Sequence, residues 1–252
     1  GSASRLSLSL GEGDAARAAQ AVGNPLAMMV VSGILYTLCI EIFLVPLLNA
    51  FGATQDVLPY AIVYTRITAV GMPLLIITNG MSNLARADGS PNYSMMCMLI
   101  GAIINTILDP LFIFKFHMGV RGAAFATVIG QFFSFLMALY YVKKFTHIRL
   151  KKQHFILKPQ VCLNIASLGM SNCLNQVAIT FVQIVMNNSM TYYGAKTIYG
   201  SEIPLAASGI VMKTNGILLS VIIGLSQGSQ PIIGFNYGAK QYDRVRGIYR
   251  LA

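Results

Sequence analysis

A single carboxylate stands in the apolar stretch of residues 101–116, GAIINTILDPLFIFKF, and it belongs to Asp109. Asn105 precedes it by about one helical turn, so both polar side chains would lie on the same face of a helix. Pro110 follows directly, and a proline inside a helix frees the carbonyl group of the residue one turn earlier, here Thr106. Because an ionisable group is costly in an apolar segment, this pattern favours a functional site over an acid that is merely paired or solvated near the end of a span.

The elements that carry this stretch are expected to be membrane helices. Of the 252 residues, 55% are hydrophobic and 10% are charged, whereas soluble domains carry about a quarter charged residues. Several windows exceed about 18 predominantly apolar residues, which predicts an all-α, polytopic membrane protein. Six spans are predicted, namely Asn24–Phe51, Val57–Leu84, Asn92–Phe116, Val120–Lys144, Gln160–Tyr192 and Pro204–Asn236.

The residues before the first predicted span, 1–22, are interpreted as the tail of a helix followed by a loop. The chain begins with Gly rather than Met, so we expect it to be a fragment of a longer protein. The four cysteines are scattered through apolar surroundings without the spacing of a metal site, so we interpret them as small core residues.

The positive charges are distributed unevenly between the two sides of the predicted spans. The positive-inside rule then places the N-terminal segment, the basic connector of residues 143–158 and the C-terminus in the cytoplasm. The net charge of +10 therefore indicates topology, and no nucleic-acid partner is expected. The cytoplasmic side carries Arg5, Arg17, Arg86, Lys143, Lys144, Arg149, Lys151, Lys152, Lys158, Lys240, Arg244, Arg246 and Arg250; the outer side carries Lys115, Arg121 and Lys196; and Arg66 and Lys213 lie inside spans.

A faint internal repeat relates the two ends of the chain. Residues 1–17 align with residues 228–244 at a constant offset of 227, and both stretches are interpreted as helix ends that run into a cytoplasmic loop. A period that contains six spans would give parallel repeats related by an axis along the membrane normal. The matched pairs are Gly1 with Gly228, Ser2 with Ser229, Gly11 with Gly238 and Arg17 with Arg244.

Two long stretches resemble the multidrug and toxic compound extrusion (MATE) family of transporters, and in particular its bacterial drug exporters. They are NLARADGSPNYSMM followed by IGAIINTILDPLFIFKFHMGVRGAAFATVIGQ, and GLSQGSQPIIGFNYGAKQYDRVR. The resemblance covers nearly the whole chain and implies twelve helices in two six-helix lobes. On this alignment the chain is a fragment that runs from the end of the second helix to just past the eighth. Residues 1–152 then belong to the N-terminal lobe, with four full spans, and residues 153–252 begin the C-terminal lobe, with two.

The resemblance also implies a cation site. In many bacterial members, an aspartate of helix five, an asparagine one turn before it and a threonine of helix six form this site with an aspartate of helix one. The matching positions here are Asp109, Asn105 and Thr127, and the helix-one partner lies outside the chain. Some members carry a glutamate in helix seven instead, and the matching span here has none. The site that couples transport to an ion is therefore expected at Asp109.

The depth of these residues supports the same cluster. Asp109 and Thr127 each lie about seven residues from the outer end of consecutive spans, which is about 10 Å into the membrane. Carboxylate, amide and hydroxyl oxygens suit a hard cation such as Na⁺. A desolvated carboxylate can carry a proton instead, so H⁺ and Na⁺ both remain open as the coupling ion. Taken alone, Thr127 would be interpreted as a helix-packing hydroxyl group.

Two oppositely charged residues, Glu41 and Arg66, are expected at similar depths on the first two spans. Glu41 lies about ten residues from the outer end of its span, and Arg66 lies about nine residues into the next one. We therefore predict an ion pair inside the membrane with a structural role, since pairing avoids the cost of an isolated charge.

The fifth span carries a polar stripe that falls within about 80° of the helix circumference. Such a stripe faces either a water-filled cavity or another helix, and the two interpretations remain open. Lys213 of the sixth span is expected to face the same interior. The stripe consists of Asn172, Gln176, Thr180, Gln183 and Asn187.

Together these features predict a monomeric, cation-coupled antiporter of a bacterial inner membrane that exports amphipathic, mostly cationic compounds, with no cofactor and with membrane lipids around it. The alternative from the same superfamily is a flippase for lipid-linked oligosaccharides or lipids, which would need several arginines in its cavity. An enzyme is disfavoured because His117, His147 and His154 all lie in connections and no nucleophile–base spacing is evident. A channel stays open, although the parallel repeat favours a transporter.

Overall fold

The computed structural model describes residues 1–145, 148, 152–198, 200 and 202–251. His147, Arg149 and Lys151, which the sequence places in the basic connector, lie outside these residues. Within the described part every regular element is a helix, which confirms the all-α prediction. The elements are α1 (Ser2–Gly11), α2 (Ala15–Ala50), α3 (Leu58–Ala87), α4 (Pro91–Pro110), the π-helical turn η1 (Leu111–Lys115), α5 (Gly119–Val142), the 3₁₀ turn η2 (Lys152–Phe155), α6 (Pro159–Gly194), α7 (Glu202–Gly238) and α8 (Tyr242–Leu251).

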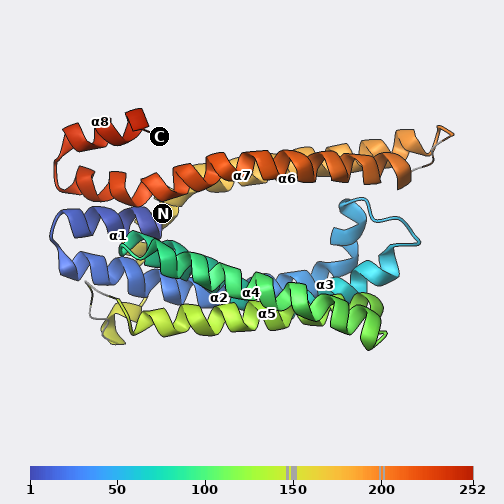
Figure 1. Cartoon of the computed structure of the whole chain (residues 1–252), viewed down its shortest axis with the longest axis horizontal. Coiled ribbons are helices and arrows are strands. Elements are labelled where there is room, and N and C mark those ends of the chain that lie inside the picture. Colours follow the sequence, from blue (N-terminus) through green and yellow to red (C-terminus); the bar gives the residue numbers. More distant parts are fainter. Residues whose placement is uncertain (146–147, 149–151, 199, 201, 252) are drawn as a thin grey trace.

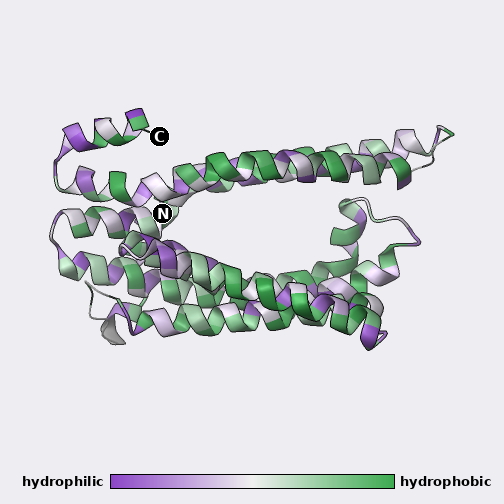
Figure 2. Cartoon of the chain, in the orientation of Figure 1, coloured by the Kyte–Doolittle hydropathy of each residue, from purple (hydrophilic) through white to green (hydrophobic). Residues whose placement is uncertain are grey.

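Six of these elements are long and apolar enough to cross a membrane, and they match the six predicted spans. They are α2, α3, α4 with η1, α5, α6 and α7. Figure 2 shows hydrophobic residues along the length of these helices. The chain therefore has the architecture of a polytopic membrane protein.

The start of the first span was predicted too late. Residues 15–22 continue α2 and are not a loop, so the helix begins at Ala15 rather than Asn24. The carboxylate of Asp14 caps this helix by accepting hydrogen bonds from the backbone N–H groups of Ala16 (3.1 Å) and Arg17 (2.9 Å). Residues 15–22 are rich in alanine and therefore form helix readily. This segment is too short and too polar to be predicted as membrane-spanning from its sequence.

The helices fall into two groups that lie side by side along the long axis of the molecule (Figure 1). Helices α2 to α5 form one group, which we call the first bundle, and α6 and α7 form an antiparallel pair, which we call the hairpin. One end of the molecule holds the α1–α2 turn, the α3–α4 turn, η2 and α8. The other end holds the α2–α3 and α6–α7 turns. The turns thus separate into the same two sides that the charge distribution predicts.

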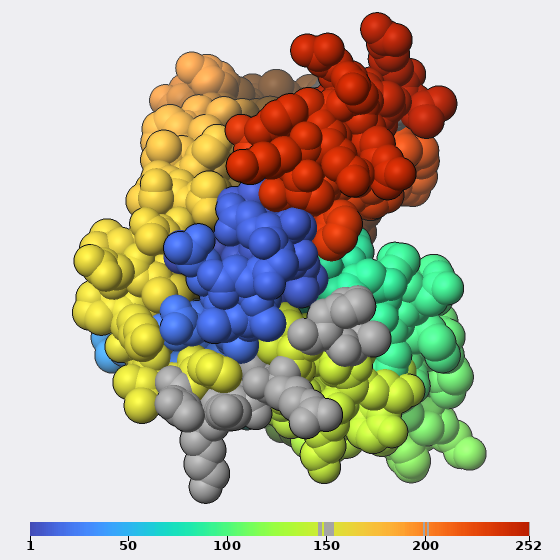
Figure 3. All heavy atoms as spheres, turned by 90° about the vertical axis from the view of Figure 1, so that its left-hand side faces the viewer, coloured from blue at the N-terminus to red at the C-terminus, as the bar shows by residue number. Residues whose placement is uncertain are grey.

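The buried core lies at the end that holds α1. Leu6 and Val22 are fully buried there, and they pack with Met81 and Leu84 of α3 and with Tyr141 of α5. The hydroxyl group of Tyr141 donates a hydrogen bond to the buried carboxylate of Asp88, at 2.9 Å. Figure 3 views this end and shows the N-terminal residues in blue between the first bundle and the C-terminal segment in red. The core therefore fixes α1 against the first bundle.

Helix α2 bends before its outer end. Phe43 has non-helical dihedral angles (φ −105°, ψ 19°) and precedes Pro46, whose ring removes a helical hydrogen bond. Beyond the bend, the last turns of α2 point toward the hairpin (Figure 1). There the side-chain amide of Asn188 in α6 donates a hydrogen bond to the carbonyl oxygen of Ala50, at 3.0 Å. This contact joins the first bundle to the hairpin at the outer end.

Candidate functional site

The backbone departs from regular α-helix just after Asp109 and Pro110. Helix α4 ends at Pro110, and the chain continues as a π-helical turn. In this turn the N–H group of Phe116 bonds to the carbonyl oxygen of Leu111, five residues earlier, at 3.1 Å. Pro110 itself cannot donate a helical hydrogen bond, and π-helical turns are frequent at functional sites.

The three residues proposed as a cation site lie together. The side-chain amide of Asn105 donates to the carboxylate oxygen Oδ1 of Asp109 at 3.2 Å and to the hydroxyl group of Thr127 at 3.4 Å. The hydroxyl group of Thr127 in turn donates to the carbonyl oxygen of Ala123 at 2.9 Å. All three side chains belong to partly buried residues. We call Asp109, Asn105 and Thr127 the polar cluster.

Two glycines let α4 and α5 approach closely enough to form this cluster. A methyl group on Gly101 would overlap the hydroxyl oxygen of Ser134 and come within 2.8 Å of the carbonyl oxygen of Gly130. A methyl group on Gly130 would come within 2.6 Å of the carbonyl oxygen of Gly101. The two backbones are therefore in direct contact one turn from Asn105 and Thr127, which brings those side chains within hydrogen-bonding distance.

A cavity of about 210 Å³ opens beside the cluster between α3, α4 and α5. Its wall includes Asn105 and Thr127 together with the polar residues Thr78, Asn79 and Gln131. The side-chain oxygen of Gln131 is buried without a hydrogen-bond partner among the described residues. Sequence reasoning missed these three residues. The sequence feature that could have identified Gln131 is its spacing, because it lies one turn after Thr127 and so on the same face of α5.

The carboxylate of Asp109 has no cationic partner in the described part of the chain, since the four ion pairs found there involve other residues. Its hydrogen bond from Asn105 leaves further lone pairs available. The carboxylate, amide and hydroxyl oxygens of the cluster are the hard ligands that a cation such as Na⁺ prefers. The arrangement therefore suits reversible binding of a small cation.

The predicted ion pair between Glu41 and Arg66 is present. The guanidinium nitrogen Nε of Arg66 lies 3.4 Å from the carboxylate oxygen Oε2 of Glu41. The pair connects α2 to α3 just before the bend at Phe43. The Arg66 side chain is 63% exposed and the Glu41 side chain is 35% exposed, so this pair lies on the outside of the first bundle and away from its core.

Hydrogen bonds join some, but not all, of the residues in the polar stripe of α6. Gln183 donates a hydrogen bond to the side-chain oxygen of Asn187 at 3.3 Å, and the hydroxyl group of Thr180 donates to the carbonyl oxygen of Gln176 at 2.9 Å. Asn172 is exposed. Lys213 on α7 is also exposed, and its amine makes no hydrogen bond or ion pair within the described residues. The role of the stripe as a cavity wall remains a prediction.

Comparison with protein families gives a match over most of the chain. The family model MatE matches residues 1–111 and 173–252. The multidrug export protein MepA of Staphylococcus aureus is 28% identical over 195 residues, which is 75% of this chain and 41% of the relative. The protein of the same name from Staphylococcus saprophyticus is 25% identical over 190 residues. The chain thus spans about two fifths of the length of these curated relatives.

Solved structures with the same fold agree with this match. An outward-facing multidrug resistance transporter of the MATE family superposes with a TM-score of 0.86 at 22% identity, over 98% of this chain and 54% of the other. A crystal structure of MATE in the bent conformation gives a TM-score of 0.83 at 22% identity, over 99% of this chain and 55% of the other. At this identity the structures support the fold alone, whereas the family model covers well over half of the residues. This chain therefore belongs to the MATE family of membrane transporters.

Proposed function

We propose that this chain is part of a cation-coupled exporter of small amphipathic compounds, mostly organic cations, in a bacterial inner membrane. The observation that supports ion coupling is the polar cluster, in which Asp109 accepts a hydrogen bond from Asn105 and has no cationic partner among the described residues. Family membership and the multidrug export relatives support the choice of substrate class. The coupling ion is H⁺ or Na⁺.

The proposed cycle follows from linkage. If a cation binds at Asp109 and a drug binds in a central cavity, each ligand biases the equilibrium between inward- and outward-facing states by its difference in affinity for the two. We place the first bundle and α1 in the N-terminal lobe and the hairpin at the start of the C-terminal lobe. The stripe on α6 and Lys213 on α7 would then form part of the wall of the drug cavity in a monomeric transporter.

The lipid-flippase alternative gains no support from the geometry. A site for lipid phosphates would need several free arginines inside the spans. Arg66 is the arginine inside a predicted span, and it is already paired with Glu41. The arrangement therefore favours an exporter of cations.

Transport by a full-length protein that contains this sequence tests the proposal. The protein would be reconstituted into liposomes with a fluorescent organic cation, and sodium and proton gradients would be imposed separately. We expect one of the two gradients to drive accumulation of the compound against its own gradient. No accumulation under either gradient would contradict cation coupling, and transport of a lipid-linked sugar in its place would favour the flippase.

The proposed topology makes a separate prediction. Ile198 in the α6–α7 turn should face the outside, and Lys158 at the start of α6 should face the cytoplasm, because the cationic residues gather at the end of the molecule that holds Lys158. Ile198 is 92% exposed, so in a cysteine-free full-length protein Ile198→Cys should react with a membrane-impermeant maleimide in intact cells, whereas Lys158→Cys should react only after permeabilisation. The reverse pattern of labelling would overturn the topology.

A further inference from the structure

An apolar groove lies on the surface of the first bundle, toward the end that holds η2. It has a volume of about 590 Å³ and is lined by residues of α2, α3, α5 and η2. Leu26 of α2 and Ile77 of α3 form its floor, since each is only 7% exposed. Its sides are open, because Val30, Leu136 and Tyr140 are all exposed. The groove is therefore accessible from the surroundings of the bundle.

The position of the groove along the helices places it in one leaflet of the membrane. Its wall on α5 begins at Phe135 and ends at Lys143, about 12 Å further along the helix axis. Half of the hydrocarbon core of a bilayer is about 15 Å thick, so this length fits within one leaflet. Lys143 directly follows the last residue of α5, so the groove ends where the span ends. With the proposed topology, that end lies at the headgroups of the cytoplasmic leaflet.

Two lysines mark the cytoplasmic end of the groove. Lys143 lines it, and the ammonium group of Lys144 lies 5.6 Å from the ring centre of Tyr140, another residue of the wall. Both lysines are exposed, and neither takes part in an ion pair within the described residues. The residues found in the wall include no acid, so the groove itself offers these lysines no counterion.

The segment before α6 gives the groove a fixed end. Phe155 of η2 belongs to the wall. Next to it, the side-chain amide of Asn24 donates to the carbonyl oxygen of His154 at 3.1 Å, and its side-chain oxygen accepts from the backbone N–H of Lys158 at 2.8 Å. Asn24 is fully buried in α2. The backbone on both sides of Phe155 is therefore tied to α2, which holds this part of the wall in place.

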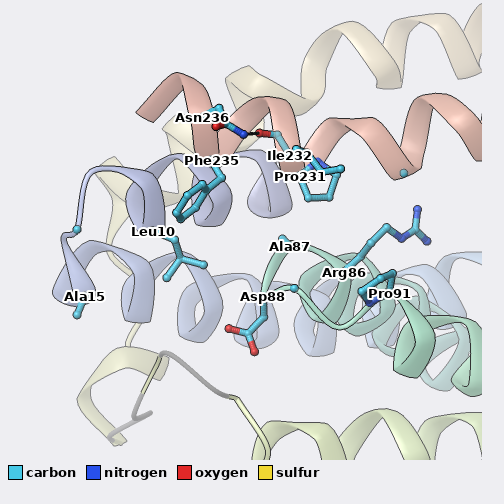
Figure 4. A pocket seen from close by; sticks show the side chains of 13 residues that line it. Leu10, Ala15, Arg86, Ala87, Asp88, Pro91, Pro231, Ile232, Phe235 and Asn236 are labelled. Atoms are coloured by element: carbon cyan, nitrogen blue, oxygen red, sulfur yellow. Dashed lines mark hydrogen bonds between the residues drawn. The ribbon is translucent and has the colours of Figure 1, made fainter. Parts of the chain in front are cut away.

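A larger cavity in the same half of the molecule has a different character. It measures about 750 Å³ and lies between α1, the α3–α4 turn and α7 (Figure 4). Its wall carries the carboxylate of Asp88 as well as the guanidinium group of Arg86, which donates a hydrogen bond to Gln227 of α7 at 2.8 Å. That cavity thus has charges of both signs and adjoins the hairpin. The groove has cations alone, and no residue found in its wall belongs to the hairpin.

From this geometry we propose that the groove binds an anionic phospholipid of the cytoplasmic leaflet, with an acyl chain along Leu26 and Ile77 and the phosphate group at Lys143 and Lys144. The inference goes beyond the proposed function and rests on the proposed topology. Any phospholipid can fill the apolar part equally well, so the two lysines decide which headgroup is preferred. Basic residues at the cytoplasmic end of a groove between membrane helices attract anionic headgroups in this way.

Quenching of a tryptophan in the wall tests the site. The chain contains no tryptophan, so Tyr140→Trp in an otherwise tryptophan-free full-length protein places a reporter in the groove. The protein would be reconstituted into liposomes that contain a small fraction of brominated phospholipid, which quenches tryptophan on contact. We expect brominated phosphatidylglycerol to quench this reporter at an on the order of tenfold lower fraction than brominated phosphatidylcholine. Equal quenching by the two lipids, or quenching by neither, would overturn the site.

A second reporter separates the groove from general attraction to lysine. Tyr192 on α6 is also exposed, and the ammonium group of Lys196 lies 3.9 Å from its ring centre, but it is at the opposite end of the molecule. Tyr192→Trp should show a weaker preference for phosphatidylglycerol than Tyr140→Trp. A preference as strong at Tyr192→Trp would mean that any exposed lysine beside an aromatic ring attracts the lipid, and it would contradict a site in the groove.

Two changes address the two parts of the site. In the Tyr140→Trp protein, Lys143→Gln with Lys144→Gln should remove the preference for phosphatidylglycerol, whereas Ala27→Phe should fill the groove and weaken quenching by both lipids. Lys240→Gln with Arg250→Gln is the matched control, because it removes the same charge from exposed positions in the α7–α8 turn and in α8. An unchanged preference in the double lysine variant would overturn the proposal, and this variant remains decisive if Ala27→Phe fails to fold.

Excess inorganic phosphate distinguishes a lipid from a soluble anion. We expect phosphate to leave the quenching of Tyr140→Trp by phosphatidylglycerol unchanged, because the groove also holds the acyl chain. Complete reversal by phosphate would show that the lysines bind a free anion instead.

These measurements do not depend on transport, so they separate the lipid site from the proposed function. If the parent exports no drug but the reporter still prefers phosphatidylglycerol, the lipid site stands and the exporter fails. If the parent exports drug but the reporter shows no preference, the lipid site fails and the exporter stands.

Discussion

Replacing Asp109 by Asn in a full-length transporter is expected to reduce drug export to the level of cells without the transporter, while most of the drug affinity remains. Asparagine keeps the shape and can still hydrogen-bond to Asn105, but it can neither release a proton nor neutralise a cation. The drug should still bind, since its cavity has other walls. Efflux of a fluorescent cation from cells and equilibrium drug binding to purified protein measure the two effects separately.

Three further variants sharpen this result. Asn105→Ala and Thr127→Ala each remove one neutral contact of the cluster, so they should raise the cation concentration for half-maximal export by on the order of tenfold and leave the maximal rate largely intact. Asp56→Asn is the matched control, because this carboxylate is exposed in the α2–α3 turn. An equal loss of export in Asp56→Asn would show that the effect of Asp109→Asn is not specific to the site.

Breaking the Glu41–Arg66 ion pair is expected to lower the stability of the folded protein more than breaking the exposed Asp243–Arg246 pair. Each side chain projects from a membrane-spanning segment, and removing its partner leaves a lone charge that costs about 2.5–3.5 kcal/mol on insertion scales. Glu41→Gln and Arg66→Gln should therefore each lower the midpoint of thermal unfolding of the full-length protein in lipid nanodiscs. The double variant should lose less than the sum of the two, because no unpaired charge remains.

The exposed pair between Asp243 and Arg246 is the control for this comparison. Its charged atoms are 3.9 Å apart and its side chains are largely exposed, so Asp243→Asn should leave the unfolding midpoint unchanged. If the losses from Glu41→Gln and Arg66→Gln simply add in the double variant, the two side chains do not stabilise each other.

Much of the fold could be predicted because membrane helices are read from local composition. The six spans follow from apolar length alone, and the structure confirms them. The bond between Asn105 and Asp109 follows from their spacing of one turn, and the Glu41–Arg66 pair follows from equal depth on adjacent helices. For both residue pairs, their positions along the chain are enough to predict that the two side chains lie close together in space.

Other features could not be predicted because they depend on contacts between distant segments. The side-chain oxygen of Gln131 lacks a hydrogen-bond partner among the described residues, and this is visible only once α3 and α5 are packed together. The bend of α2 lies at Phe43, before Pro46, and only the structure shows that it turns the helix end toward Asn188. The exposure of Lys213 likewise depends on where the hairpin lies.

The repeat is an intermediate case. The sequence shows Gly11 opposite Gly238 in an alignment with few matches, and a glycine pair alone does not indicate a contact. The structure shows that each glycine packs against the backbone of the other copy. Symmetry between the two contacts, rather than similarity of sequence, is what makes the repeat convincing.

Exchange of drug for cation by proteoliposomes tests the central claim, that Asp109 couples transport to an ion, most directly. Coupling is reciprocal, so a drug gradient imposed across the membrane should drive the coupling ion in the opposite direction, which an ion-sensitive dye or radioactive sodium would detect. We predict this ion flux in the parental protein and in Asp56→Asn, and its loss in Asp109→Asn. An Asp109→Asn protein that exchanges drug for cation at the parental rate and ratio would contradict the account.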